Sequence, residues 1–326
     1  MSEMFLEIKE TSRRFGGGKS LFGKALPSVH AVQSVSLEVR KGETLGVVGE
    51  SGCGKSTLAR LVAGLDSPTA GTILLEGRDL VAEAKRDRRA LARKVQYVFQ
   101  DPVASLNPRK RIRTILEAPL IQLLGLDRQK RQERLVELME AVNLAPEFLD
   151  RYPHEFSGGQ AQRIGIARAL AADPELIILD EPVSALDVSV QAQVLNILDD
   201  LKEKFGLTYI FISHDLSVVE SISDRVAVMY FGQVVELGKA EDVFKSAHHP
   251  YTRLLLQSAP VPGRKSMLSE DANTELPDPY NPPVGCAFHA RCERRVEMCE
   301  FAQPSLDADA KMVDHLCACF NQERQA

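Results

Sequence analysis

Gly49-Glu-Ser-Gly-Cys-Gly-Lys-Ser56 matches the pattern G-x-x-x-x-G-K-[ST] at every fixed position. The apolar run Thr44-Leu-Gly-Val-Val48 precedes this stretch, and a helical pattern of apolar residues follows it from Leu58. Its glycines let backbone N–H groups curl around a phosphate, and a helix that begins near Lys55 points its positive end at the same anion. The stretch therefore predicts a strand, a phosphate-binding loop and a helix. The residues expected to contact a nucleotide are Gly49, Glu50, Ser51, Gly52, Cys53, Gly54, Lys55, Ser56 and Thr57.

A second acidic element supports this interpretation. The apolar run Leu176-Ile-Ile-Leu179 ends in Asp180 and Glu181. A carboxylate at the end of a buried strand beside a phosphate loop supports Mg²⁺, and we assign that role to Asp180 together with the Ser56 hydroxyl. Glu181 can then orient or deprotonate the attacking water, because hydrolysis needs a proton acceptor in line with the γ-phosphate. We expect ATP and Mg²⁺ as cofactors, with Lys55 and Glu181 as catalytic residues.

Short apolar runs that alternate with helical patterns predict an α/β fold around a parallel sheet. Further strands are expected over Val95–Phe99 and Thr208–Ile212, and a helix over Val190–Phe205 that ends at Gly206. Residues 105–165 contain helical patterns alone, so we expect a helical subdomain inserted between two strands. The basic run Lys85–Lys94 is interpreted as a solvated helix face that precedes a strand.

Composition excludes several classes of protein. The 326 residues are 44% apolar and 26% charged, which is ordinary for a globular chain with a core. The net charge of −5 argues against a surface for nucleic acid, since such surfaces need a basic excess. No run approaches the roughly 18 apolar residues of a membrane span, and the first residues do not resemble a secretory signal. We therefore expect a cytosolic chain whose cysteines are reduced or metal-bound.

Further motifs identify a resemblance to the ATP-binding-cassette family. Ser157-Gly-Gly-Gln160 resembles the signature motif of that family, Gln100 its Q-loop, Ser184-Ala-Leu-Asp187 its D-loop and His214 its switch histidine. With the phosphate loop and Asp180-Glu181, these motifs occur in the order of the family. The resemblance implies a P-loop cassette with a core like that of RecA, an antiparallel β subdomain and an inserted helical subdomain.

The resemblance also implies how ATP is held. In the family, two cassettes face each other head to tail, and each ATP lies between the phosphate loop of one chain and the signature motif of its partner. Gln100 would then sense Mg²⁺ and the water, His214 would contact the γ-phosphate, and Phe15 would stack on adenine. A core or surface role for Phe15 stays open, because Gly16–Ser28 resembles an inserted flexible loop. The residues implied to contact the partner's ATP are Ser157, Gly158, Gly159, Gln160 and Asp187.

Several stretches resemble one branch, the ATPase subunits of bacterial oligopeptide and dipeptide importers. They include Phe99-Gln-Asp-Pro-Val-Ala-Ser-Leu-Asn-Pro108, His249-Pro-Tyr-Thr-Arg-Leu-Leu255 and Asn281-Pro-Pro-Val-Gly-Cys-Ala-Phe-His-Ala-Arg-Cys292. The branch implies a cassette over residues 1–255 and a C-terminal extension over 256–326. It also implies a second homologous ATPase, two transmembrane permease subunits and a substrate-binding protein as partners, at the cytoplasmic face of the inner membrane. Importers of nickel or glutathione share this extension and stay as alternatives.

All cysteines except Cys53 lie near the C-terminus, behind a stretch rich in Pro and Ser that we interpret as a linker over Pro260–Pro283. Their spacing matches neither zinc ribbons nor ferredoxins, so spacing alone leaves Zn²⁺, an iron–sulfur cluster and unmetallated thiols open. The resemblance implies a structural [4Fe–4S] cluster, with Cys317 competing with Cys319 as the last ligand. The implied ligands are Cys286, Cys292, Cys299 and Cys319.

Two other functions are weighed against the transporter. A soluble cassette protein of translation or DNA repair usually carries two cassettes, long coiled coils or zinc hooks, and this sequence has one cassette and no sustained heptads. A regulatory subunit that binds ATP without hydrolysing it would not need Lys55, Asp180, Glu181 and His214 together.

Overall fold

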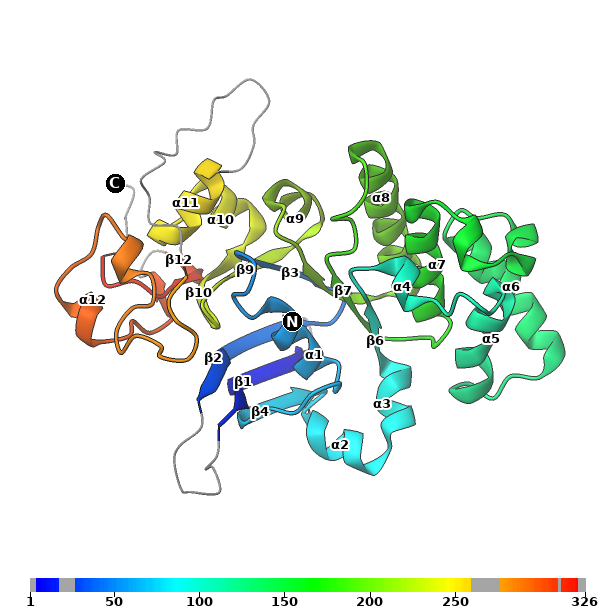
Figure 1. Ribbon diagram of the computed structural model, residues 1–326, viewed down its shortest axis with the longest axis horizontal. Helices are drawn as coiled ribbons and strands as arrows, with labels where there is room; N and C mark the ends of the chain where they lie inside the picture. Colours follow the sequence, from blue (N-terminus) through cyan, green and yellow to red (C-terminus); the bar gives the residue numbers. More distant parts are fainter. Residues whose placement is uncertain (1–3, 18–26, 259–275, 310–311, 322–326) are drawn as a thin grey trace.

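The computed structural model describes residues 4–17, 27–258, 276–309 and 312–321. Two sheets pack on opposite sides of helix α1 (Lys55–Val62), which contacts strands of both (Figure 1). The smaller sheet is antiparallel, and its strands in spatial order are β2 (Ser28–Arg40), β1 (Met4–Gly16), β4 (Ala70–Leu75) and β5 (Arg78–Asp79).

The larger sheet forms the centre of the molecule. Its spatial order is β11 (Asp307–Asp309), β12 (Met312–Cys317), β10 (Gln233–Lys239), β9 (Arg225–Tyr230), β3 (Thr44–Val48), β8 (Thr208–Ile212), β7 (Leu176–Asp180) and β6 (Val95–Val98). Strands β9, β3, β8, β7 and β6 are parallel, whereas β10, β12 and β11 continue the sheet in antiparallel pairs. The α/β class and the predicted strands are confirmed.

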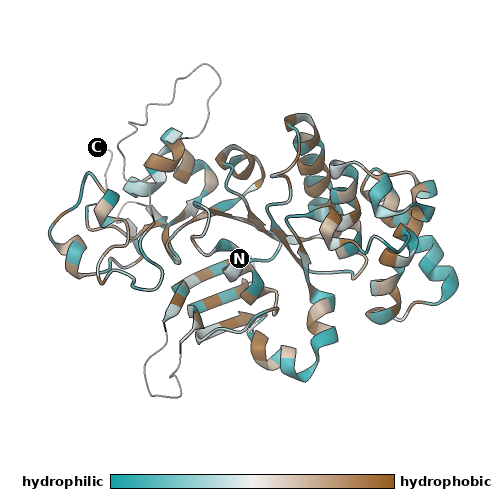
Figure 2. Ribbon diagram, in the orientation of Figure 1, coloured by the Kyte–Doolittle hydropathy of each residue, from teal (hydrophilic) through white to brown (hydrophobic). Residues whose placement is uncertain are grey.

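Burial explains why the central strands are apolar throughout. Every residue of β3, β7 and β8 is buried, as expected for parallel strands covered on both faces. These strands appear brown through the middle of the molecule in Figure 2. The predicted helix is α8 (Val188–Phe205), and Gly206 ends it in the left-handed conformation with φ 62°. Helix α9 (Leu216–Ile222) packs against β3.

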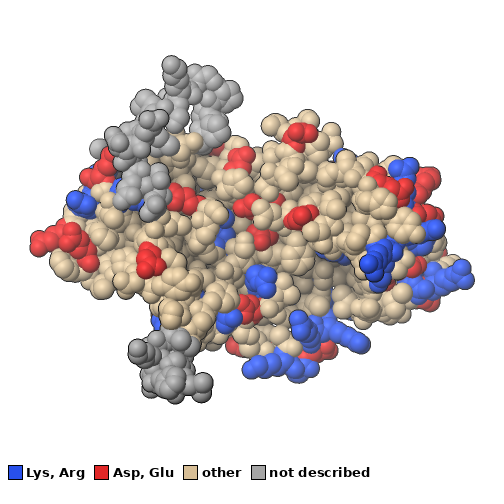
Figure 3. All heavy atoms as spheres, viewed as in Figure 1, with Lys and Arg blue, Asp and Glu red and all other residues tan. Residues whose placement is uncertain are grey.

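The structure describes every residue between β6 and β7. These residues form helices and turns, and none of them belongs to a strand. They comprise α4 (Pro102–Ser105), α5 (Ile112–Gln122), α6 (Arg128–Ala141), the 3₁₀ turns η1 (Pro146–Asp150) and η2 (Pro153–Glu155), and α7 (Gly158–Leu170). The basic run lies in α2 (Leu80–Arg86) and α3 (Arg88–Lys94), and α3 leads directly into β6 as predicted. Figure 3 shows charged side chains of both signs gathered over the helical end of the molecule.

The C-terminal residues are more than a tail behind a linker. After α10 (Ala240–Lys245) and α11 (Pro250–Ser258), the described chain resumes at Leu276 and contains η3 (His289–Arg291) and α12 (Met298–Phe301). Strand β12 then pairs with β10, so the extension adds two strands to the central sheet. Most of the predicted linker lies outside the described residues. Among the described residues, none of the helices has both the length and the apolar character needed to cross a bilayer.

Candidate nucleotide-binding and hydrolysis site

The predicted phosphate loop connects β3 to α1. Gly54 caps α1 with φ 104°, and a Cβ at this position would lie 2.2 Å from the carbonyl oxygen of Ala31. Only glycine fits there, which explains the fixed glycine of the motif. Lys55 is buried, and its Nζ donates to the carbonyl oxygens of Gly49 at 2.6 Å and Glu50 at 2.9 Å. These two hydrogen bonds from Lys55 hold the phosphate loop in a closed conformation.

One cavity brings the loop together with residues from distant parts of the sequence. Val29, His30 and Ala31 of β2 line one side of it. The sequence-predicted residues that line the same cavity are Ser51, Gly52, Gly54, Lys55, Ser56, Thr57, Gln100, Glu181 and His214. Residues predicted from separate motifs therefore face one space.

Ser56 lines this cavity and contacts Asp180, which does not line it. The Ser56 hydroxyl donates to Oδ1 of Asp180 at 3.0 Å, and the Tyr97 hydroxyl donates to Oδ2 at 2.6 Å. Burial, and next the hydrogen bond to Asp180, raises the pKa of Tyr97, so this phenol stays a donor. A serine hydroxyl and a carboxylate are hard oxygen ligands, and they fit Mg²⁺, which completes its shell with phosphate and water oxygens. The sequence analysis did not identify Tyr97.

Glu181 is held beside them by two partners. Gln100 Nε2 donates to Oε2 of Glu181 at 2.9 Å, and His214 Nδ1 lies 3.3 Å from Oε1. The backbone of Glu181 has φ 48°, a strained conformation for a residue with a side chain, and its N–H donates to the carbonyl of Ile212 at 2.9 Å. The three side chains expected to act on water and the γ-phosphate therefore converge.

The signature residues lie elsewhere. Ser157 caps α7, where its hydroxyl accepts from the Gln160 N–H at 3.3 Å while Gln160 Oε1 accepts from the Ser157 N–H at 3.0 Å. Ser157, Gly158 and Asp187 are exposed. No signature residue and no Asp187 lines the cavity of the chain's own phosphate loop, an arrangement that leaves them accessible to a second molecule.

Phe15 stands at the edge of the site. It pairs with Val29 in the small sheet, and Val29 lines the cavity whereas Phe15 does not. The ring is 40% exposed, and the Arg13 guanidinium lies 4.6 Å from its centre. The contact with adenine stays a prediction.

The cysteines of the extension form a second cluster. Cys286, Cys292, Cys299 and Cys319 line one cavity, whereas Cys317 lies in β12 and does not line it. Burial is the main cause that raises the pKa of Cys286 to about 11. Among the described residues, no three of these sulfurs lie within 4.8 Å of one another. Four thiols around one cavity are a donor set that suits Zn²⁺ or an iron–sulfur cluster.

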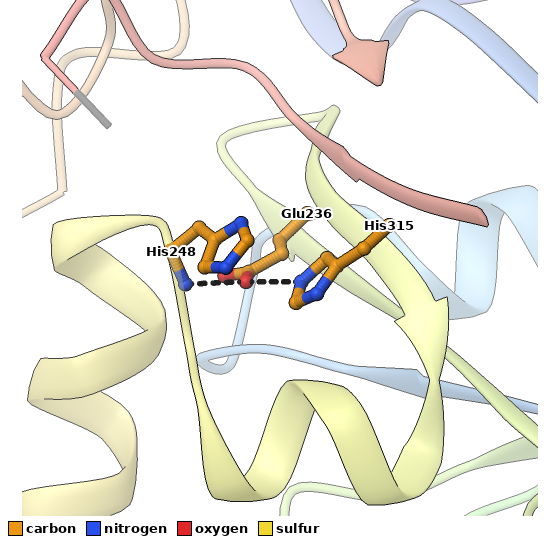
Figure 4. A group of neighbouring side chains, drawn as sticks. All are labelled: Glu236, His248 and His315. Carbon is orange, nitrogen blue, oxygen red and sulfur yellow. Dashed lines mark hydrogen bonds and ion pairs between the residues drawn. The ribbon is translucent and has the colours of Figure 1, made fainter. Parts of the chain in front are cut away.

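Glu236, His248 and His315 are a buried group that the sequence analysis missed (Figure 4). Oε1 of Glu236 accepts from the His248 backbone N–H at 2.6 Å and lies 2.7 Å from Nε2 of His315, while Oε2 accepts from the His249 N–H at 3.0 Å. Both carboxylate oxygens of Glu236 thus have hydrogen-bond partners within the protein. We interpret the group as a clamp between β10, β12 and the start of α11 rather than as a metal site.

The geometry defines a class: a P-loop ATPase of the ATP-binding-cassette type. Comparisons with known proteins agree. Residues 32–184 match the family model for ABC transporters, and residues 235–299 match the model for the oligopeptide/dipeptide transporter C-terminal region. A solved dimeric structure of the cassette MJ0796, in a post-hydrolysis state with ADP and phosphate, aligns with a TM-score of 0.64 at 28% identity and covers 72% of this chain and 98% of that one.

Full-length relatives narrow the class. The chain is 48% identical to the oligopeptide transport ATP-binding protein AppF of Bacillus subtilis, over 97% of both chains. It is 49% identical to the dipeptide transport ATP-binding protein DppF of Escherichia coli, over 90% of this chain and 87% of that one. The chain therefore belongs to the ABC transporter family, in the branch of the ATP-binding subunits that carry the oligopeptide/dipeptide C-terminal region.

Proposed function

We propose that this chain hydrolyses ATP to drive import of dipeptides or oligopeptides across the bacterial inner membrane. The observation that carries the proposal is the convergence of Lys55, Ser56 and Glu181 in one cavity, with Asp180 hydrogen-bonded to Ser56, within a chain whose C-terminal region matches that of peptide transporters. The similarity to oligopeptide and dipeptide transport ATP-binding proteins over most of the chain favours peptides over nickel or glutathione as cargo. The chain would act at the cytoplasmic face, bound to two permease subunits that receive cargo from a substrate-binding protein.

Each of the predicted catalytic and nucleotide-binding side chains has a role in this proposal. Lys55 and the loop amides bind the β- and γ-phosphates, and Ser56, Gln100 and Asp180 hold Mg²⁺ and its waters. Glu181 accepts the proton of the attacking water, and His214 contacts the γ-phosphate. Phe15 stacks on adenine.

The signature residues, of which Ser157 and Gly158 are exposed, would complete the site of a partner. In a head-to-tail pair with a second homologous ATPase, Ser157, Gly158, Gly159 and Gln160 at the start of α7 would bind the triphosphate held by the partner's phosphate loop, and Asp187 would lie at the same junction. Residues 1–255 act as the cassette in this proposal, and residues 256–326 as the extension.

Replacement of Glu181 tests the catalytic assignment. In the reconstituted complex, Glu181→Gln should keep MgATP binding and lower turnover by about 10²–10⁴-fold, the usual contribution of a general base. Glu203→Gln, on the exposed face of α8, is the matched control and should hydrolyse ATP normally. Retained turnover in Glu181→Gln would overturn the assignment of the base.

We also propose that Cys286, Cys292, Cys299 and Cys319 hold a [4Fe–4S] cluster. Support comes from their shared cavity, which Cys317 does not line. The cluster would stabilise the fold of the extension, and no step of ATP hydrolysis passes through it. Iron, sulfide and zinc are measured per chain after anaerobic purification, with an absorption spectrum near 400 nm. About four iron and four sulfide are expected; stoichiometric zinc, or no metal, would refute the cluster.

A further inference from the structure

The extension touches the phosphate loop through one ion pair. Arg291, in η3, donates from Nη1 and Nη2 to the two carboxylate oxygens of Glu50, each at 2.9 Å. The Arg291 side chain is 10% exposed and that of Glu50 is 28% exposed. A bidentate arginine–carboxylate pair is stronger and more directional than a single contact. An arginine guanidinium stays charged in proteins, so the contact is an ion pair.

Three groups of Glu50 have hydrogen-bond partners within the chain. Its carboxylate binds Arg291, its N–H donates to the Tyr251 hydroxyl at 2.9 Å, and its carbonyl accepts from Lys55 Nζ. Arg291 and Tyr251 both belong to the C-terminal part of the chain, and Tyr230 lies between them, with its hydroxyl 3.4 Å from Arg291 Nη1. The conformation of the loop therefore depends on residues that lie far outside its motif.

A second contact brings the extension to the mouth of the nucleotide cavity. Pro279 lines that cavity, and its carbonyl accepts from the backbone N–H of His30 at 3.3 Å. Leu276 lies close enough to meet a Cβ built on Gly52 at 3.8 Å. The residues that follow the undescribed segment are thus packed beside the phosphate loop.

The charge of Glu50 explains why the ion pair matters for nucleotide binding. Glu50 places a negative charge in a loop that binds a polyanion, and an unpaired carboxylate there would repel the phosphates. Because Arg291 neutralises this charge and fixes its position, we propose that Arg291 is a positioning residue for the nucleotide, through which the extension sets the affinity of the phosphate loop. The proposal rests on nucleotide binding by this loop and not on the identity of the cargo.

Binding of MgADP to the purified full-length chain tests this, since ADP needs neither turnover nor a partner ATPase. Isothermal titration calorimetry should give a Kd about tenfold higher for Arg291→Met than for the unchanged chain, equivalent to about 1.4 kcal/mol. Arg295→Met removes a nearby exposed arginine and should leave Kd unchanged. The double variant Glu50→Gln with Arg291→Met should recover most of the affinity, because it removes the unpaired charge.

The recovery of affinity in the double variant distinguishes a positioning role of Arg291 from a general loss of fold. An unchanged Kd in Arg291→Met would overturn the proposal, and so would a double variant that binds as weakly as Arg291→Met alone. If Arg291→Met does not fold, Arg291→Lys decides the matter. This variant keeps a positive charge beside Glu50 but loses the bidentate pairing, so its Kd for MgADP should rise by about threefold, and an unchanged Kd would refute the positioning role. These measurements concern nucleotide binding alone. A failure of peptide transport in a separate assay would therefore not change their interpretation.

Discussion

Each carboxylate oxygen of Asp180 has its own donor, Ser56 on one side and Tyr97 on the other. The Ser56 contact is one that Mg²⁺ binding would rearrange, whereas Tyr97 can keep its hydrogen bond when the ion is present. Tyr97 stands in an apolar strand, where a tyrosine is equally common as a packing residue, so no spacing rule could distinguish it. Its function becomes visible only when β6 and β7 are adjacent in the sheet.

We predict that Tyr97→Phe weakens the Mg²⁺ site. The variant loses one hydrogen bond to Asp180, and a net loss of about 1 kcal/mol corresponds to about a fivefold change in affinity. The Mg²⁺ concentration for half-maximal ATPase activity should rise about fivefold, with near-normal turnover at saturating Mg²⁺. Tyr280→Phe, at an exposed tyrosine, should leave the Mg²⁺ dependence unchanged. The same Mg²⁺ dependence in both variants would contradict the role of Tyr97.

At the scale of elements, α7 must approach α8 closely to place the signature residues. A Cβ on Gly159 would lie 2.3 Å from Cγ1 of Val190, whereas a Cβ on Gly158 would meet its nearest neighbour, Leu186, at 3.6 Å. The two adjacent glycines therefore have different structural roles. The sequence motif identified both without distinguishing them, because the distance to α8 is a property of packing.

We predict that Gly159→Ala destabilises the chain by about 1–3 kcal/mol, the usual cost of overpacking. Gly158→Ala serves as the control and should be neutral, since its Cβ makes an ordinary contact. Urea denaturation measures both. Val190→Ala combined with Gly159→Ala should restore most of the lost stability by removing the methyl groups that clash. No difference between the two glycine variants would show that the helices separate at little cost.

The cysteine cluster illustrates what sequence order could not settle. Cys317 and Cys319 are two residues apart, and both were candidates for the fourth ligand. Strand β12 pairs Cys317 with Glu236 of the central sheet, whereas Cys319 lies after the strand and lines the cavity of the other cysteines. The choice depends on where a strand ends, which spacing does not reveal.

A matched pair of variants tests this choice. Cys319→Ala should lose most of the iron and of the absorption near 400 nm, because the proposed cluster would lose one of its four ligands. Cys317→Ala should keep the iron and lose only a little stability, since it removes a buried sulfur outside the cavity. Iron analysis after anaerobic purification compares the two. Loss of iron in Cys317→Ala with retention in Cys319→Ala would reverse the assignment.

At the scale of the whole molecule, the extension is part of the cassette's structure. Strands β11 and β12 widen the central sheet, the Glu236 clamp joins β12 to β10 and α11, and Arg291 reaches the phosphate loop. The sequence predicted the cassette motifs because each is a local pattern with its own physical signature. It did not predict the contacts between distant segments: His315 is 79 residues from Glu236, and Arg291 is 241 residues from Glu50.

The clamp makes stability depend on acid pH. Burial alone would raise the pKa of Glu236, but hydrogen bonds from His315, His248 and His249 outweigh burial and hold the pKa below its ordinary value. The unfolded chain therefore binds a proton at this carboxylate at a higher pH than the folded chain does. The stabilisation is complete above the unfolded pKa and is lost as pH falls through the folded pKa.

We predict that Glu236→Gln flattens this dependence. Below about pH 4.3, the ordinary glutamate value, the free energy of unfolding of the unchanged chain should fall by up to about 1.4 kcal/mol per pH unit through this one group. Urea denaturation between pH 7 and acid pH measures the slope, and Glu203→Gln is the exposed control. Equal slopes in Glu236→Gln and the control would contradict the clamp's contribution.

The most direct test of the account is peptide uptake by the reconstituted transporter. Proteoliposomes containing this chain, its partner ATPase, the two permease subunits and the substrate-binding protein are supplied with MgATP on the side of the ATPases and with a labelled dipeptide on the other. The account predicts transport towards the ATPase side that requires ATP and stops in Glu181→Gln, whereas Glu203→Gln transports normally. Transport that continues in Glu181→Gln, or ATP hydrolysis by the assembled complex with no movement of peptide, would contradict it.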